Sequence, residues 1–476
     1  MLVPAKPYQV ESRMAQALFI GGTASHVGKS WFTAAFCRLL AQRGRKVAPF
    51  KAQNMSNNSY PCIEGGEIGR SQAMQAEACG LPPMADMNPV LLKPESERAS
   101  QVVVRGRVWR SVEAARYYNH TPALMDLAFE SYDKLAAQFD WIVCEGAGSV
   151  AEVNLFDRDI TNLRFAERVG ARALLVADIE RGGVFASLVG TMDLLPTSQR
   201  ALVRAFAVNR FHGDVRLFDE GVRFLEQRLG IPCLGVFPFA RDIALDDEDC
   251  LSIEESVAGD SGIAVIRLPR ISNFTDFRAL GPVAWITKPV DRQYRVVFLP
   301  GTKNTIEDLL WMREQGLDEW VHRQHAGGAR IVGICGGYQM LGLRVEDPDG
   351  VESHHGAVEG LGLLPASTVL QRDKVTRVVD VRTRGGVPFR AYEIHMGVTI
   401  AEGGEPFAHM ADGRPEGCRI ARVMGTYLHG AFDNPLGVKE LLGLDVVAVD
   451  KSAMYDRLAG WLMEHSRPEV LERMLA

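Results

Sequence analysis

The chain has 476 residues, of which 47% are hydrophobic and 24% are charged, and its formal net charge is −6. This composition is ordinary for a globular protein, and the length predicts two or three domains. The weak negative charge argues against nucleic acid or an anionic membrane surface as the main partner. No stretch reaches the roughly 18 apolar residues that a membrane-spanning helix needs.

The N-terminal residues and the cysteines give an indication of the cellular compartment. The first dozen residues lack the apolar core of a signal peptide, and we interpret them as a loose leader before the first strand. The eight cysteines are scattered, with no C-x-x-C pair and no zinc spacing, so we expect neither a disulfide framework nor a structural metal site. These features favour a cytoplasmic protein and leave open whether it forms a homo-oligomer.

Short apolar strands alternate with helical stretches along the chain. In the first half the predicted strands are residues 18–20, 46–50, 141–144, 173–177, 205–208 and 233–236, with a helix after Lys29. Buried strands between helices are typical of a mainly parallel sheet with helices on both faces. The acidic segment at 246–262 has no periodicity and is predicted to be a linker. A second α/β series follows, with strands at 263–266, 296–299 and 331–334 and helical periodicity over 452–475.

A glycine-rich loop follows the first predicted strand and opens a helix. Its sequence is Gly21-Gly22-Thr23-Ala24-Ser25-His26-Val27-Gly28-Lys29-Ser30. Backbone N–H groups in such a turn can cradle phosphate oxygens, while Lys29 would pair with the β- and γ-phosphates and Ser30 would ligate Mg²⁺. Thr23 stands where the strict motif has glycine, so the loop is a variant. Nucleotide binding is therefore a better interpretation of this loop than an accidental glycine-rich turn.

Two carboxylates lie where apolar strands end. Glu145 precedes a Gly-Ala-Gly turn, and Asp178 precedes Arg181-Gly182-Gly183. Open α/β sheets bind ligands at this edge, so either carboxylate could hold Mg²⁺ directly or through water. The alternative role of a helix cap or turn carries more weight for Asp178 than for Glu145.

This loop and turn resemble the dethiobiotin synthetase-like branch of phosphate-loop enzymes. That branch has the same G-T-x-x-x-x-G-K-[ST] variant and Glu-Gly-Ala-Gly turn, and Lys51 matches one of its lysines. The resemblance implies ATP binding through Thr23, Gly28, Lys29, Ser30 and Lys51. It also implies a reaction in which ATP converts a carboxylate or carbamate into a mixed phosphate anhydride.

A cysteine turn, Gly333-Ile334-Cys335-Gly336-Gly337, lies between a predicted strand and helix. Such an elbow projects its nucleophile from a cramped turn, and a helix N-terminus favours the thiolate. Backbone N–H groups at Gly336 and Gly301 could bind the developing oxyanion. The preferred proton donor to the leaving group is His429, and His395 is its competitor.

This constellation resembles the class I glutamine amidotransferases. Many members have a glutamate two residues after the histidine, but here that position is Ala431. We therefore expect a Cys335–His429 dyad, assisted by water or another carboxylate, and do not assign that role to Asp433. The combined resemblances imply an α/β protein with two domains. A phosphate-loop NTPase-type parallel sheet would occupy residues 14–251, a flavodoxin-like amidotransferase domain residues 262–440, and a helical segment residues 441–476.

The order of the two domains resembles the corrinoid amidases of cobalamin biosynthesis, and matching segments span almost the whole chain. Among them are 51–58, 87–94, 178–185, 209–214, 271–277, 299–305 and 392–397. The resemblance implies ATP- and glutamine-dependent amidation of four carboxylates of adenosylcobyrinic acid a,c-diamide. It also makes Asn54, Asn57, Asn58 and Lys93 candidates for binding the corrinoid, although each could equally be a turn or capping residue.

Rival interpretations stay open. The resemblance implies that the corrinoid is a substrate rather than a cofactor, and the absence of the D-x-H-x-x-G cobalamin motif agrees with this. The nearest rival is the sister reaction, amidation of the a and c carboxylates of cobyrinic acid. A ligase for another polyacid, such as a cell-wall precursor, or a non-enzymatic ATP-dependent partitioning or scaffold protein fits the residues less well.

Overall fold

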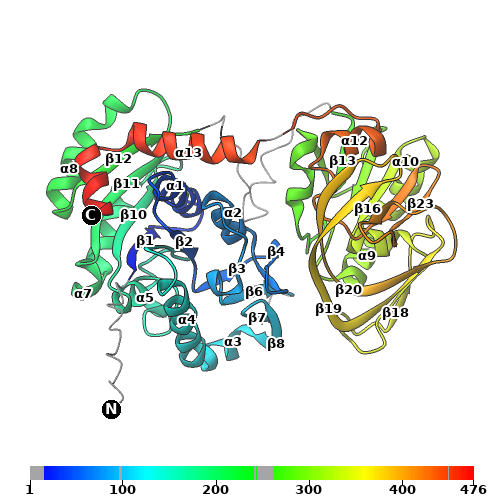
Figure 1. Ribbon diagram of the computed structural model, residues 1–476, viewed down its shortest axis with the longest axis horizontal. Helices are drawn as coiled ribbons and strands as arrows, with labels where there is room; N and C mark the ends of the chain where they lie inside the picture. Colours follow the sequence, from blue (N-terminus) through cyan, green and yellow to red (C-terminus); the bar gives the residue numbers. More distant parts are fainter. Residues whose placement is uncertain (1–14, 96–98, 241–242, 244–260, 449) are drawn as a thin grey trace, which may run out of the picture.

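The computed structural model describes residues 15–95, 99–240, 243, 261–448 and 450–476. The expected leader and almost all of the expected acidic linker lie outside these residues. Within the described part, every helix is too short or too polar to cross a membrane. Figure 1 shows two α/β bodies side by side, with the chain returning to the first body at its C-terminus.

The first body is built on a six-stranded sheet in the order β12-β11-β10-β1-β9-β2, and all its neighbours are parallel. The strands are β1 (Gln16–Gly22), β2 (Val47–Phe50), β9 (Trp141–Glu145), β10 (Arg172–Asp178), β11 (Val203–Phe211) and β12 (Cys233–Pro238). All six strands predicted in this half are confirmed. Because their apolar residues are buried on both faces, continuous apolar runs were a sufficient signal.

Helices cover both faces of this sheet. Alternate residues of β1 point to opposite sides, so Leu18 and Ile20 join one hydrophobic cluster while Ala17 and Phe19 join the other. The first cluster is covered by α1 (Lys29–Gln42), α2 (Arg70–Ala78), α13 (Lys451–His465) and α14 (Pro468–Leu475). The second is covered mainly by α4 (Thr121–Ala136), α5 (Leu163–Arg168), α6 (Val184–Leu194) and α8 (Asp219–Leu229). Two short helices, α3 (Ala114–Tyr117) and α7 (Thr197–Arg200), complete this body.

The C-terminal helices pack on the first body rather than beside the domain that precedes them in sequence. The ring of Trp461 on α13 lies 5.5 Å from Phe32 of α1 and 4.9 Å from Phe237 of β12. Figure 1 shows α13 in red, reaching from the second body back across the top of the first. The chain therefore crosses between the two bodies twice.

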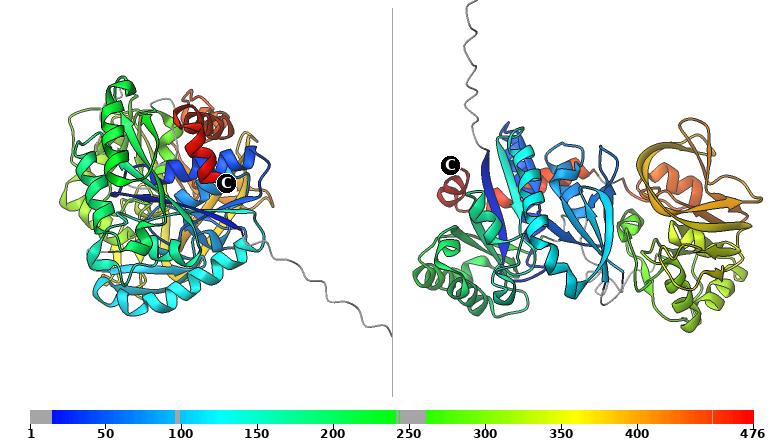
Figure 2. Two further views of the ribbon diagram at one scale, coloured as in Figure 1. Left: turned by 90° about the vertical axis from the view of Figure 1, so that its left-hand side faces the viewer. Right: turned by 90° about the horizontal axis from the view of Figure 1, so that it is seen from below.

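Small strands extend the first body towards the second. A four-stranded sheet has the order β3-β6-β7-β8, and β4 pairs with β5 in a separate hairpin. Their bounds are β3 (Gln53–Met55), β4 (Ser59–Pro61), β5 (Glu67–Gly69), β6 (Val90–Pro94), β7 (Ala99–Val104) and β8 (Arg107–Glu113). The right-hand view of Figure 2 shows this region between the main sheet and the second body.

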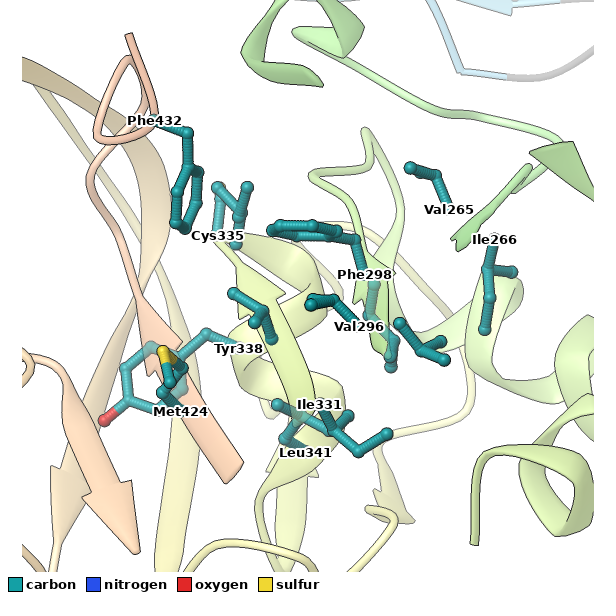
Figure 3. Packing of buried hydrophobic residues seen from close by; sticks show 14 of the residues in the cluster. Val265, Ile266, Val296, Phe298, Ile331, Cys335, Tyr338, Leu341, Met424 and Phe432 are labelled. Carbon is teal, nitrogen blue, oxygen red and sulfur yellow. The ribbon is translucent and has the colours of Figure 1, made fainter. Parts of the chain in front are cut away.

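The second body has its own six-stranded sheet, in the order β14-β13-β15-β16-β24-β23. Its strands are β13 (Ile263–Ile266), β14 (Ala284–Ile286), β15 (Val296–Leu299), β16 (Arg330–Ile334), β23 (Cys418–Ile420) and β24 (Val423–Thr426). Its helices are α9 (Thr305–Glu314), α10 (Leu317–Ala326), α11 (Gly336–Leu341) and α12 (Pro435–Leu442). The three strands predicted here are confirmed, and Figure 3 shows how their side chains meet in one core that includes Cys335.

A long antiparallel hairpin, β19 (Ala366–Thr383) and β20 (Pro388–Ala401), dominates a third sheet. The short strands β17 (Arg344–Glu346), β18 (Ala357–Glu359), β21 (Ala408–Met410) and β22 (Pro415–Glu416) complete it. Both long strands contact β4 of the first body. This contact brings residues of the two bodies together close to the cysteine elbow.

Candidate active sites

Cys335 occupies a strained position between β16 and α11. Its φ is 53° and its ψ is −110°, a region that side-chain-bearing residues rarely adopt outside functional sites. The next turn needs glycine, since a Cβ on Gly337 would lie 2.0 Å from the carbonyl oxygen of Leu299. The buried thiol donates to the carbonyl oxygen of Ile394 over 3.4 Å. The elbow thus projects its sulfur against the segment that carries the competing histidine.

His429 is fully buried and has a carboxylate partner. Its Nδ1 lies 2.7 Å from Oδ2 of Asp276, whose Oδ1 accepts a hydrogen bond from the backbone N–H of Gly430 over 2.8 Å. Burial alone would lower the pKa of His429, but Asp276 and then Cys335 outweigh it and raise the pKa to about 10. A charged imidazolium beside the sulfur is suited to protonating a leaving amine.

His395 is held in a different arrangement. Its Nδ1 lies 2.8 Å from the carbonyl oxygen of Gly397, and its ring stacks on Tyr427 with 3.8 Å between centroids. Its Nε2 faces Glu393 at 3.9 Å. Both ring nitrogens are thus directed at groups other than the thiol, so the geometry favours His429 as the partner of Cys335.

The two glycines expected to form an oxyanion hole lie close to the cysteine elbow and the histidine. A Cβ on Gly336 would lie 2.7 Å from Cγ2 of Thr302, and one on Gly301 would lie 3.1 Å from Cε1 of His429. Gly336 is the first residue of α11, where backbone N–H groups have no partner within the helix. The loop of Gly301 and Thr302 therefore packs against both the elbow and the ring of His429.

Asp276 was not identified from the sequence. It lies on the 3₁₀ helix Phe274–Leu280, in the part that overlaps the family-like segment 271–277. Its contact with His429 joins residues 153 positions apart, so no local spacing rule could reveal it. The only available signal was a carboxylate in a segment that matched the family, when the usual position held Ala431.

A cavity of about 650 Å³ opens beside the phosphate loop. Its lining includes Gly28, Lys29, Ser30, Lys51, Asn54 and Glu145. The Lys29 ammonium donates to the carbonyl oxygens of Ala24 and Gly148, both over 2.9 Å. Thr23 does not line this cavity; its backbone N–H donates to Val176 over 3.0 Å and continues the strand pairing.

Glu145 is the centre of a buried polar network at this cavity. Its Oε1 accepts from the Ser30 hydroxyl over 2.9 Å and from the Lys51 ammonium over 2.8 Å, while Oε2 accepts from Gln75 over 2.5 Å. Burial would raise the pKa of Glu145, but Lys51 and the hydrogen bonds outweigh it and hold the pKa below its ordinary value. A charged carboxylate therefore lies next to the hydroxyl expected at a metal.

Asp178 lies apart from this network. Its Oδ1 accepts from the backbone N–H of Glu180 over 2.7 Å, and its Oδ2 accepts from Arg210 over 3.1 Å. Arg210 lines the cavity, whereas Asp178 does not. These contacts match the turn role weighed from the sequence and place Arg210 between the aspartate and the cavity.

The four candidate corrinoid-binding residues are divided by position. Asn54 lines the cavity, whereas Asn57, Asn58 and Lys93 lie outside its lining. The ammonium of Lys93 donates to Oγ of Ser59 over 2.9 Å and to Glu67 over 2.8 Å. Glu67 also pairs with Lys374 of β19, so Lys93 belongs to an ion cluster between the two bodies.

Comparison with protein families gives a match for each body. Residues 18–251 match the CobQ/CobB/MinD/ParA nucleotide binding domain. Residues 262–436 match the CobB/CobQ-like glutamine amidotransferase domain. The nucleotide-binding match contains the phosphate loop with Glu145, and the amidotransferase match contains Cys335, His429 and Asp276.

Curated relatives match over nearly the full length. A cobyric acid synthase of Parabacteroides distasonis is 42% identical over 487 residues, which covers 96% of this chain and 98% of the relative. Those of Bacteroides fragilis and Syntrophobacter fumaroxidans are 43% and 42% identical, and cover 94% and 97% of this chain and 96% and 99% of their own. With this similarity and both domain matches, the chain belongs to the cobyric acid synthase family.

Proposed function

We propose that the chain amidates the b, d, e and g carboxylates of adenosylcobyrinic acid a,c-diamide, using one glutamine and one ATP for each amide. The observation that carries the proposal is the joint presence of the Cys335–His429–Asp276 arrangement and a phosphate-loop cavity in one chain. The first releases ammonia, and the second activates a carboxylate. Together they define a glutamine-hydrolysing carbon–nitrogen ligase.

In the first half-reaction the Cys335 sulfur attacks the side-chain amide carbon of glutamine. The oxyanion is stabilised by backbone N–H groups at Gly336 and Gly301. His429 then donates its proton to the nitrogen as the C–N bond breaks, leaving a thioester and ammonia. Water, deprotonated by His429, attacks the thioester and releases glutamate. Asp276 keeps the imidazole oriented throughout, as the carboxylate does in Ser-His-Asp sites.

In the second half-reaction a corrinoid carboxylate oxygen attacks the γ-phosphorus of ATP, and ADP leaves. Lys29 would stabilise the charge that develops on the phosphate oxygens. Ammonia then attacks the acyl carbon, phosphate leaves, and loss of a proton gives the carboxamide. Asn54 lies where an amide side chain can meet carboxylates or carboxamides of a substrate in the cavity.

Ser30 and Glu145 fit a magnesium site. Both offer oxygen ligands, which Mg²⁺ prefers, and they lie 2.9 Å apart at the cavity. Across the described residues no group of three His, Cys, Asp or Glu could hold a metal alone, so phosphate oxygens and water would complete the site. When bound, Mg²⁺ supplies charge neutralisation at the phosphates.

Ammonia would reach the cavity along the buried polar face of α2. Within the described structure, Ser71 Oγ, Gln72 Nε2 and Gln75 Oε1 are buried without a protein hydrogen-bond partner. Since buried polar atoms are almost always paired with protein or water, a small polar molecule suits this face. Oε1 of Gln72 accepts a hydrogen bond from Nδ2 of Asn54 over 2.9 Å, and Asn54 lines the cavity.

Mass counting tests the proposal. Purified chain is incubated with ATP, glutamine and each corrinoid acid, and each conversion of a carboxylate to an amide lowers the product mass by about one dalton. Four conversions of the a,c-diamide support the proposal. Two conversions of cobyrinic acid, with none on the a,c-diamide, would identify the sister reaction instead. No glutamate release from glutamine would remove the glutamine-hydrolysing half of the proposal.

A further inference from the structure

The ring of His429 ends a stack of side chains that begins in the other body. Tyr392 of β20 stacks on His429 with 5.2 Å between centroids and an angle of 23°. Tyr60 of β4 packs against Tyr392, with 4.7 Å between centroids and a tilt of 54° between the rings. The guanidinium of Arg70, at the start of α2, lies 4.7 Å from the centre of the Tyr60 ring. Two of these four side chains belong to the nucleotide-binding body.

A second contact reaches His429 at its edge. Asn273 has the left-handed conformation, with φ 52°, and is buried. Its Oδ1 accepts from the backbone N–H of Ser59 over 3.0 Å, and its Nδ2 lies 3.4 Å from Nε2 of His429. Nε2 is the ring nitrogen left to serve Cys335, because Nδ1 is held by Asp276. Both contacts therefore start from neighbouring residues of β4.

The segment that supplies these contacts is anchored at the nucleotide cavity. Ser59 of β4 pairs with Gly69 of β5, directly before α2. One turn along α2, Gln75 donates to Glu145. The β4–β5 pair and the start of α2 thus join the carboxylate beside the phosphate loop to the ring of the catalytic histidine.

We propose that Tyr60 and Ser59 of the nucleotide-binding body are positioning residues of the glutamine-hydrolysing site, acting on His429 through Tyr392 and Asn273. The inference rests on the proposed function, because it deepens the account of the same histidine. An aromatic face stabilises a neighbouring cation, so the stacked Tyr392 favours the imidazolium form. Tyr60 holds the Tyr392 ring in place against His429. The Ser59–Asn273 contact holds the edge of the His429 ring that carries Nε2.

The inference predicts an effect on the pH profile. The titratable groups facing His429 are the Asp276 carboxylate, the Cys335 thiol and the Tyr392 phenol, and the groups that act on Tyr392 in turn are Arg70, Tyr60 and Asp433. Replacing Tyr60 with leucine leaves the groups that contact His429 in place and removes the ring packed against Tyr392, together with its contact to Arg70. We expect Tyr60→Leu to reduce glutaminase kcat about three- to tenfold, the range for weakening one cation–π contact, here that of Tyr392 with the imidazolium. The KM for glutamine should stay near wild type, and the basic limb of the profile should move to lower pH.

The experiment measures glutamate release by the full chain over a range of pH. Tyr60→Phe is the conservative control and should restore the wild-type rate and profile, because the ring is kept. Glu95→Gln is the matched control: it removes a different contact between the bodies, the ion pair with Lys303 at 3.3 Å, without touching Tyr60 or Ser59. It should keep the wild-type pH profile. Circular dichroism and thermal melts compare folding of the variants, and Asn273→Gly offers an independent break of the second contact if Tyr60→Leu does not fold.

Three outcomes would overturn the inference. They are a wild-type rate and profile in both Tyr60→Leu and Asn273→Gly, the same loss in Tyr60→Phe, or the same profile shift in Glu95→Gln. The last result would mean that docking of the bodies in general, rather than this stack, sets the histidine. An inactive wild-type chain would instead refute the proposed function, so the two failures are distinguishable.

Discussion

The cysteine site and the phosphate-loop site differ in the partners of their charged groups. At the cysteine site, Asp276, His429 and Cys335 already lie in the order that the chemistry uses. At the phosphate loop, Lys29 holds two backbone carbonyl oxygens, and Glu145 binds both Ser30 and Lys51. The cysteine site is already organised for nucleophilic attack. At the phosphate-loop site, Lys29 and Glu145 must first exchange their partners within the protein for phosphate and metal.

This difference has a physical reason. Glu145 and Lys51 are both buried, and an uncompensated buried charge costs several kcal/mol. Their mutual pairing therefore keeps the cavity stable until a nucleotide brings charges of its own. The cysteine site needs no such exchange, because its substrate glutamine has a neutral side-chain amide. Damage to one site should therefore leave the chemistry of the other in place.

The largest effect is expected for Cys335→Ser. Loss of the nucleophile should reduce glutamate release by about 10⁴-fold or more. Amidation with ammonium chloride as nitrogen source should remain, because the phosphate-loop site is untouched. The measurement compares corrinoid amidation with glutamine and with ammonium. Cys418→Ser, at another buried cysteine of the same body, should keep glutaminase activity; equal loss in both variants would contradict the assignment.

Asp276→Asn should lower glutaminase kcat by about 10²- to 10⁴-fold, by analogy with loss of the orienting carboxylate in Ser-His-Asp sites. Burial of His429 favours its neutral form, and the Asp276 charge reverses this to give a pKa of about 10. Without that charge the pKa falls, so the imidazolium is lost earlier on raising the pH. The basic limb of kcat should therefore move to lower pH.

A matched variant tests whether Asp276, rather than any nearby carboxylate, has this role. Asp433 is the closer candidate in sequence, and it lies 3.8 Å from Lys451. Asp433→Asn should leave the pH profile of glutamate release unchanged. A shift in this variant but not in Asp276→Asn would reverse the assignment.

Lys29→Met should affect only the second site. Loss of one positively charged phosphate contact is expected to reduce amidation by about 10²- to 10³-fold, with either glutamine or ammonium as nitrogen source. Glutamate release without ATP should stay at its wild-type level. The exposed Lys46 provides the control, since Lys46→Met should support normal amidation. A selective loss of glutaminase activity in Lys29→Met would contradict the division of labour.

The sequence predicted the parts of the two sites that depend on local pattern. Strands buried on both faces appear as apolar runs, and the elbow and phosphate loop are short motifs with fixed neighbours. The pairing of His429 with Asp276 could not be predicted, because the two residues lie 153 positions apart in the sequence. The hairpin β19–β20 was also missed: its strands are half exposed and rich in charge, so they lack an apolar run.

The C-terminal helices are a second example of a contact that the local sequence pattern does not predict. Their helical periodicity over 452–475 was evident, but nothing in the pattern says which surface an apolar face will cover. Trp461 packs against Phe32, more than 400 positions earlier. The sequence therefore predicts that these helices exist and leaves their partner to the tertiary structure.

The smallest effect concerns the connection between the two sites. Ser71 is buried on α2, and its hydroxyl is one of the atoms without a protein partner in the described structure. Ser71→Leu would fill the polar face of this helix with an apolar side chain. We expect a several-fold fall in amides formed per glutamate released, because ammonia lost to solvent becomes protonated ammonium and is no longer a nucleophile.

Ser71→Ala separates blockage from loss of the hydroxyl, since it removes the oxygen without adding volume. It should keep the wild-type ratio of amide to glutamate, whereas Ser71→Leu should lower the ratio while both half-reactions persist. Overpacking a buried site also costs about 1–3 kcal/mol of stability, so the ratio rather than the rate is the decisive quantity. A damaged fold lowers both products together, but a blocked passage lowers only the amide. If Ser71→Leu keeps the ratio, ammonia does not travel along α2, and the two sites must communicate by another route.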